Sequence, residues 1–268
     1  MPSNIILFGE CGVGKSSIIN LIAGHHQAGV SSSAKGCTLH ATPYNVSVCG
    51  HSLTLWDTAG LNEGEKGTVT DIRAISNLYS LLKNLEGGVS LLVFCMRASR
   101  INGAAEKNWK FFREIVCQKR VPTVIIVTHL ELEKGSMDDW WTRNERAFRT
   151  YEINPSTDNH PTGVACVTAT KGKLKGNGYQ FEEEYNLSQQ KARDLITRAY
   201  LRVPWKVAPV EWFKTIVDRT TETDCWGNVT HVREERRRLP GRGVHELVSR
   251  CKISEAEATT LANALGGV

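Results

Sequence analysis

The chain has 268 residues, of which 41% are apolar and 23% are charged, and its formal net charge is +5. This composition is that of a globular protein large enough to bury a core without disulfides or metals, so it excludes a disordered or fibrous chain. The small positive charge permits anionic ligands, but a nucleic-acid partner is not expected because such a partner needs charge concentrated on one face.

The eight cysteines form no C-x-x-C pair, and some of them, such as Cys95 and Cys166, lie inside apolar runs. This is typical of reduced, buried cysteine in a cytoplasmic protein. We find no secretory signal and no apolar run long enough, about 18 residues, to span a bilayer. We therefore expect a cytoplasmic location and no stable membrane insertion.

Apolar runs typical of strands alternate with segments of helical periodicity along most of the chain. The expected strands are 5–8, 46–48, 53–56, 89–95, 121–127 and 164–168. The runs at 89–95 and 121–127 are continuously apolar, as in strands that are buried on both faces of a parallel sheet. Helical spacing covers 69–85, and a last helix is expected near 181–201. The pattern predicts a three-layer α/β fold with a mostly parallel sheet.

Two places interrupt this alternation. Gly50–His51 resembles a tight turn between two adjacent strands, which predicts one antiparallel edge strand. Near residue 202 the pattern changes to a segment rich in proline and tryptophan. We therefore expect a nucleotide-binding domain over residues 1–202 and a mainly helical extension of unknown role over residues 203–268, whose last helix begins with a capping box at Ser254 and Glu257.

A phosphate-binding loop is predicted between the first strand and the first helix. The motif G-x-x-x-x-G-K-[ST] is matched by Gly9, Glu10, Cys11, Gly12, Val13, Gly14, Lys15 and Ser16, and Ser17 follows it. Backbone N–H groups of such a loop and of the following helix start converge on a β-phosphate. Lys15 should bridge the β- and γ-phosphates, and the Ser16 hydroxyl should bind Mg²⁺.

A second motif, D-x-x-G, lies at the end of the third expected strand as "LTLWDTAGL". Asp57 should hold Mg²⁺ through water, and the N–H of Gly60 should contact a γ-phosphate. A threonine of the preceding loop should reach Mg²⁺ when the γ-phosphate is present. We expect this to be Thr38, with Thr42 as the alternative.

Together these motifs resemble the translation-factor-type P-loop GTPases, within the branch of immunity-associated (AIG1-type) GTPases, septins and chloroplast import receptors. The sequence is also similar to fungal proteins described only as G domain-containing. The resemblance covers residues 4–200 through the segments "GECGVGKSSIINLIAG", "AKGCTLHATPYNV", "LWDTAGLNEGEKGTV" and "LEGGVSLLVFCMR". It implies a Ras-like G domain that binds GTP or GDP with Mg²⁺.

The resemblance also implies how guanine is recognised, although the usual N/T-K-x-D motif is changed to Thr128-His129-Leu130-Glu131. His129 would lie along the base, and the Glu131 carboxylate would accept hydrogen bonds from the ring, with Glu133 as the alternative. The N–H of Ala169, in the turn after the sixth strand, would meet the guanine oxygen.

Hydrolysis is expected to be slow, because Leu61 occupies the position at which Ras-like proteins have a water-orienting glutamine. Cys11 also adds a side chain at a position that is glycine in Ras-like proteins. The resemblance implies that an arginine after the fourth strand can act across a homodimer formed through the nucleotide face. Arg97 is the candidate catalytic arginine, and Arg100 is the alternative. The other candidate catalytic residues are Lys15, Thr38 and Gly60.

Three other functions compete with a regulatory GTPase. One is a nucleotide-stabilised assembly scaffold with little turnover, and another is a P-loop ATPase or kinase. The third is a nucleic-acid-associated GTPase that uses residues 233–242, which include the basic run "REERRR" at 233–238. We interpret that run as the solvated face of a helix, since two glutamates dilute its charge. The effector protein is not predicted.

Overall fold

The computed structural model describes residues 2–29, 41–61, 70–155, 163–223 and 229–266, and within these ranges the side chains of 70–71 and 220–233 are not described. The described chain separates into two compact units, Met1–Ala208 and Pro209–Val268. The predicted boundary lay near residue 202. Each unit is described by itself.

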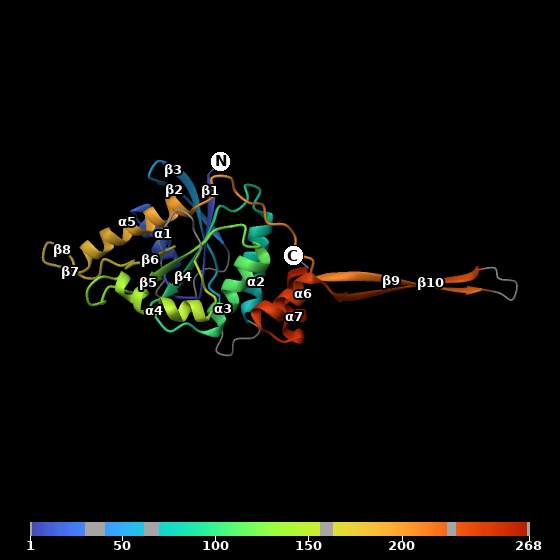
Figure 1. Ribbon diagram of the computed structural model, residues 1–268. Helices are drawn as coiled ribbons and strands as arrows, with labels where there is room; N and C mark the ends of the chain where they lie inside the picture. Colours follow the sequence, from blue (N-terminus) through green and yellow to red (C-terminus); the bar gives the residue numbers. More distant parts are fainter. Residues whose placement is uncertain (1, 30–40, 62–69, 156–162, 224–228, 267–268) are drawn as a thin grey trace. The chain divides into compact units, whose positions relative to one another are not determined.

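The first unit contains most of the elements (Figure 1). They are, in chain order, β1 (Ser3–Phe8), α1 (Lys15–Ala23), β2 (Thr42–Val48), β3 (His51–Asp57), α2 (Thr70–Asn84), β4 (Leu91–Arg97), α3 (Gly103–Lys110), the π-helix η1 (Phe111–Val116), β5 (Thr123–Thr128), α4 (Asp138–Thr150), β6 (Val164–Cys166), β7 (Leu174–Lys175), β8 (Gly178–Tyr179) and α5 (Glu182–Ala199).

Six strands form one sheet in the order β2-β3-β1-β4-β5-β6. All neighbours are parallel except the edge pair β2–β3. The turn of that pair is at Cys49–Gly50, one residue before the predicted position. Both residues have positive φ (48° and 78°), as a two-residue hairpin turn requires. The expected fold class is confirmed.

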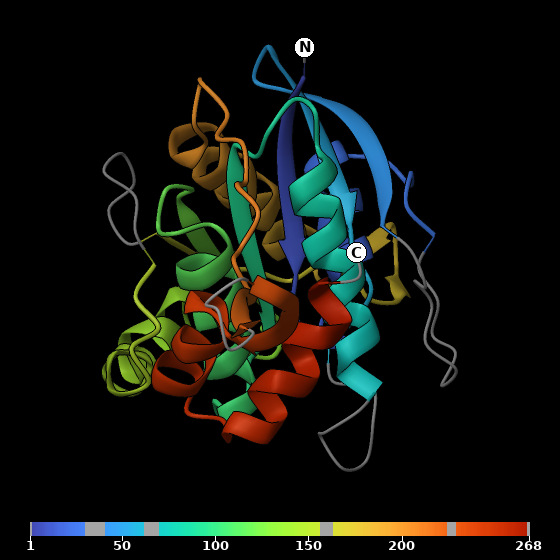
Figure 2. The ribbon, with the colours of Figure 1, turned by 90° about the vertical axis from the view of Figure 1, so that its right-hand side faces the viewer.

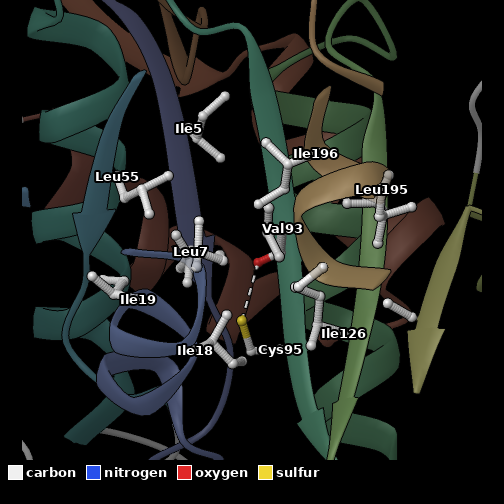
Figure 3. Close-up of a cluster of buried hydrophobic side chains, with 14 of the residues drawn as sticks. Ile5, Leu7, Ile18, Ile19, Leu55, Val93, Cys95, Ile126, Leu195 and Ile196 are labelled. Carbon is white, nitrogen blue, oxygen red and sulfur yellow. Dashed lines mark hydrogen bonds between the residues drawn. The ribbon is translucent and has the colours of Figure 1, made fainter. Parts of the chain in front are cut away.

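Helices cover both faces of the sheet, which explains the continuously apolar strands. In Figure 2, α2 crosses in front of the strands and α5 lies behind them. Alternate strand residues therefore enter two different cores. Ile5, Leu7, Val93 and Ile126 pack against α1 and α5, as Figure 3 shows.

The other face of the sheet is packed with aromatic side chains. The ring of Phe8 lies 5.2 Å from that of Phe94 and 5.4 Å from that of Phe112, and Phe94 meets Trp109 at 5.7 Å. Trp109 and Phe112 belong to α3 and η1, which are thereby fixed on β1 and β4. The loops that follow β1 and β4 therefore begin from strands that are firmly packed.

Cys95 of β4 points into the core between the sheet and α1, where its Sγ lies 3.7 Å from the carbonyl oxygen of Val93 (Figure 3). Burial raises the pKa of its thiol to about 12. Cys166 is likewise buried, and burial raises its pKa to about 12. Both cysteines are therefore buried and protonated, as expected.

The second unit contains β9 (Phe213–Thr223), β10 (Val229–Pro240), α6 (Arg242–Cys251) and α7 (Glu255–Gly266). Its helices confirm the expected helical part of the extension. The capping box at the start of α7 is also confirmed, since the N–H of Ser254 donates to Glu257 at 2.9 Å and the N–H of Glu257 donates to Ser254 Oγ at 3.2 Å. The long β9–β10 hairpin was not predicted. The interpretation of "REERRR" as a helix face is wrong, because 233–238 lie on strand β10.

Candidate nucleotide-binding site

The carboxyl ends of β1, β3, β4 and β5 meet at one edge of the sheet, where loops of an open α/β sheet build ligand sites. The loop after β1 requires glycine at two points. Gly9 has a φ of +151°, and a Cβ there would lie 2.1 Å from the Cys95 carbonyl oxygen. Gly14, with a φ of +91°, is the residue before α1. The predicted loop-to-helix geometry of a phosphate site is therefore present.

Lys15 is the first residue of α1 and is buried. Its Nζ donates to the carbonyl oxygens of Gly9 at 3.2 Å and of Glu10 at 3.0 Å. The ammonium group is thus folded back over the loop, where a phosphate oxygen would compete with the two carbonyls. This is the position from which a lysine reaches β- and γ-phosphates.

Ser16 and Asp57 meet as predicted for a metal site. The Ser16 hydroxyl donates to Asp57 Oδ2 at 2.5 Å. The other carboxylate oxygen, Oδ1, is buried and has no hydrogen-bond partner among the residues that the structure describes. Burial raises the pKa of Asp57, whereas Ser16 and the charge of Lys15 lower it. An unsatisfied buried carboxylate beside a hydroxyl is a donor set that fits Mg²⁺ and its water ligands.

The D-x-x-G segment is hydrogen-bonded to the phosphate loop. The N–H of Leu61 donates to the Gly9 carbonyl at 3.0 Å, and the N–H of Cys11 donates to the Leu61 carbonyl at 3.2 Å, which makes a short parallel bridge. Gly60 is so close that a Cβ on it would lie 2.6 Å from Cys11 Cα. The side chain of Leu61 is completely buried.

The predicted base-binding residues lie at the ends of β5 and β6. Thr128 is buried, and its Oγ1 lies 2.8 Å from the Val13 carbonyl oxygen and 2.9 Å from Nδ1 of His129. This hydroxyl therefore joins the base side of the site to the phosphate loop. His129 is exposed and has a φ of 63°. Burial and the charge of Arg97 lower the pKa of His129, while Glu131 raises it.

The structure distinguishes the two glutamates that the sequence left as alternatives. The Thr168 hydroxyl donates to Glu131 Oε2 at 3.2 Å, so this carboxylate is held beside the turn that contains Ala169. Glu133 instead pairs with Arg143 of α4 at 2.5 Å. Of these two glutamates, Glu131 is therefore the one whose carboxylate lies beside the turn of Ala169, where the base is expected to bind.

The remaining predicted residues have different positions. Arg97 is exposed at the end of β4, in register with Thr128 of β5, and Arg100 is exposed in the next loop. Thr42 is exposed at the start of β2. Thr38 lies outside the described residues.

Asn102, which was not predicted as a site residue, holds the phosphate loop. The Asn102 side chain caps α3 by accepting from the N–H of Ala105 at 2.8 Å, and it donates to Glu10 Oε1 at 2.8 Å. An asparagine just before a helix is a recognisable cap. Its reach to Glu10, however, depends on β1 and β4 being neighbours.

The fold and site define a Ras-like P-loop GTPase domain, in which the loop after β1 and the carboxylate after β3 share one sheet edge. A family model described as 50S ribosome-binding GTPase matches residues 4–129. This part of the chain therefore matches a GTPase domain, and the predicted resemblance to P-loop GTPases is confirmed.

One of the similar solved structures supports this fold. It describes dimerization as important for the GTPase activity of the chloroplast translocon components atToc33 and psToc159. It is 18% identical, covers 73% of this chain and 83% of that chain, and has a TM-score of 0.52. Toc33 from Arabidopsis thaliana in complex with GDP and Mg²⁺ is 16% identical, covers 75% of this chain and 88% of that chain, and has a TM-score of 0.48.

No curated protein matches the chain. No helix among the described residues has the length and apolarity to cross a bilayer.

Proposed function

We propose that this protein binds guanine nucleotides with Mg²⁺ and hydrolyses GTP slowly, as a cytoplasmic molecular switch. The observation that carries the proposal is the pair of Ser16 and Asp57 beside the phosphate loop, with one buried carboxylate oxygen unsatisfied. Mg²⁺ held there, with Thr38 as a further ligand, would neutralise charge on the β- and γ-phosphates. Lys15 would bind the same phosphates, and the Gly60 N–H would contact the γ-phosphate.

Guanine selectivity is assigned to Glu131, with His129 along the base and the Ala169 N–H at the guanine oxygen. Support comes from the hydrogen bond that holds Glu131 beside the turn of Ala169. The pairing of Glu133 with Arg143 makes Glu133 the weaker candidate. A carboxylate that accepts from the base discriminates guanine from adenine, because adenine offers no such donors at these positions.

Slow intrinsic turnover follows from Leu61, whose apolar side chain is buried and cannot orient water. A second copy of the chain would supply the missing transition-state charge through Arg97, which is exposed at the same edge of the sheet. The chloroplast translocon GTPases, for which dimerization is described as important, motivate this step. An arginine supplied in trans can raise the rate by roughly 10³–10⁵.

A scaffold that binds nucleotide with little turnover is the second candidate. The burial of Leu61 favours it, as does the backbone bridge that holds Leu61 to the phosphate loop. The two candidates share the nucleotide site and differ only in hydrolysis.

The first experiment is calorimetric titration of nucleotide-free protein with GDP and with ADP, each in Mg²⁺. Tight GDP binding without measurable ADP binding is expected, and equal affinities would contradict guanine recognition. GTP turnover per molecule is then measured against protein concentration. A rise with concentration that Arg97→Ala abolishes and Arg100→Ala leaves intact supports the catalytic dimer. Turnover that stays near zero at every concentration supports the scaffold.

A further inference from the structure

The β9–β10 ribbon of the second unit is an isolated two-stranded sheet. Its strands pair from Phe213–Pro240 at the base to Thr223–Val229 at the far end. Figure 1 shows it extending away from α6 and α7 of the same unit. Within the described residues, neither outer edge of this sheet pairs with another strand. The side chains of Ile216, Val217 and Leu239 are each more than 40% exposed.

Such a ribbon is an unusual element for a chain to build alone. A lone two-stranded hairpin is marginally stable in water, and a long unpaired strand edge presents a row of hydrogen-bonding groups to other strands. The charges along the edge therefore decide which partner it accepts.

The charged side chains of β10 are complementary to those of a second β10 strand that pairs with it in the antiparallel direction. Residues 234–238 are Glu-Glu-Arg-Arg-Arg, and all five side chains are exposed. In antiparallel pairing of two copies centred on Arg236, Glu234 faces Arg238 and Glu235 faces Arg237. Each pairing occurs twice by symmetry, so four opposite-charge pairs form and only Arg236 meets its own copy. Residues directly opposite in an antiparallel pair lie on the same face and interact.

Neighbouring registers lose this match. Centring the pair on Glu235 places two glutamates together and sets Arg233 against Arg237. Centring it on Arg237 sets arginine against arginine at three positions. The outer edge of β9, centred on Ile216, offers only two opposite-charge pairs, between Lys214 and Asp218. Among these antiparallel pairings, the charges of β10 therefore favour the register centred on Arg236.

The arginines of the ribbon are poorly placed for nucleic acid. Arg219 pairs with Glu234 at 2.7 Å, and Nε of Arg237 donates to Asp218 at 2.8 Å. The guanidinium of Arg238 lies over the Phe213 ring at 3.7 Å. Arg219 and Arg237 are thus already balanced by local carboxylates, and a ribbon of mixed sign fits a surface of mixed sign better than a row of phosphates.

We propose that β10 pairs antiparallel with β10 of a second copy of this chain, in the register centred on Arg236. The product is a four-stranded sheet in which the two β10 strands are central and the two β9 strands form the edges. The contact is isologous, so it closes as a symmetric dimer. It is separate from the nucleotide-face dimer proposed above.

The test uses the full-length chain and measures the dimer dissociation constant by sedimentation equilibrium. Glu235→Arg sets arginine against arginine twice and should weaken the dimer about tenfold or more. Because residue 235 faces Asp218 of its own β9, the same change gains an opposite charge within the ribbon. A loss of dimer therefore cannot arise from unfolding of the hairpin. Glu86→Arg, the same charge change at an exposed site of the first unit, should have no effect.

A charge swap gives the sharper result. Arg237→Glu alone should weaken the dimer, while an equimolar mixture of E235R and R237E chains should form a heterodimer. The double variant E235R/R237E should dimerise like the wild type. Arg236→Gln removes the single like-charge pair and should tighten the dimer a few-fold.

The measurements are repeated in an Arg97→Ala background, which separates this contact from the nucleotide face. The proposal is overturned if the wild-type chain is monomeric up to high micromolar concentration. It is also overturned if the dimer ignores E235R, or if the ribbon instead binds a labelled random-sequence RNA in a salt-dependent way without dimerising.

Discussion

At the phosphate end of the nucleotide site the chain offers mostly backbone groups, whereas at the base end it offers side chains. The loop after β1 is shaped by glycines with positive φ, and its carbonyls hold Lys15. The proposed base end would depend on a hydroxyl, an imidazole and a carboxylate, at Thr128, His129 and Glu131. Backbone geometry tolerates little change, because a single Cβ on Gly9 would meet a carbonyl oxygen. Side chains at the base end can be exchanged one at a time, and the altered T-H-x-E motif is where this sequence departs from the usual pattern.

The largest expected effect is therefore at the phosphate end. Lys15→Ala removes a buried ammonium that would bind two phosphates, and charged hydrogen bonds contribute about 1.5–3 kcal/mol each. We expect GDP affinity to fall about 100-fold or more by calorimetry. Lys175→Ala, in the exposed β7, is the matched control and should leave the affinity unchanged. An unchanged affinity of K15A would show that the phosphates bind elsewhere.

At the base end, Glu131→Ala should reduce the ratio of GDP to ADP affinity about tenfold or more, while ADP affinity changes little. The control is Glu133→Ala, whose carboxylate pairs with Arg143. If E133A lowers the ratio and E131A does not, the assignment of the guanine-binding carboxylate is reversed.

A third change should act in opposite directions on stability and on metal binding. Asp57 is desolvated, which raises its pKa, so its ionised form destabilises the metal-free protein above the ordinary value of 3.8. Asp57→Asn removes this buried charge and should raise the free energy of unfolding by about 1 kcal/mol without Mg²⁺. The same variant should lose the Mg²⁺ dependence of GDP affinity. Thermal unfolding and titration, each with and without Mg²⁺, check both signs.

The smallest effect is expected at His129. Its pKa is lowered, so the folded chain binds fewer protons than the unfolded chain just below the ordinary value of 6.5. Stability is therefore fully present above pH 6.5 and decreases as the pH falls toward the lowered pKa. Solvent limits the effect to a few tenths of a kcal/mol at this exposed side chain. His129→Gln should flatten the dependence measured by urea unfolding between pH 7 and pH 5, and an unchanged slope would assign it to other groups.

Most of the sheet and the whole phosphate loop could be predicted from the sequence, because their signals are local. The run Leu91–Met96 is buried along its full length, as expected for a strand covered on both faces. The ribbon could not be predicted, because the sequence Glu-Glu-Arg-Arg-Arg fits a helix face and an exposed strand equally well. What makes it a strand is pairing with β9, including the bond from Arg219 to Glu234.

The proposed base-binding residues could be predicted only in part, unlike the phosphate loop, which was predicted, and the ribbon, which was not. The T-H-x-E segment could be located by its place after a buried strand, but the choice between Glu131 and Glu133 could not be made. That choice depends on Thr168, in the turn after β6, and on Arg143 of α4, which the fold brings to the two carboxylates. Local patterns record neither contact.

The backbone bridge between Glu10 and Leu61 also determines how often the chain occupies a form in which this bridge is broken. Its two backbone hydrogen bonds contribute about 1 kcal/mol each, so the form in which both are broken would be populated at roughly one molecule in thirty. A ligand that prefers the broken form by about 100-fold would therefore make it the majority. Under the proposed function, gain or loss of the γ-phosphate would therefore shift the balance between the two arrangements of the Gly60 segment.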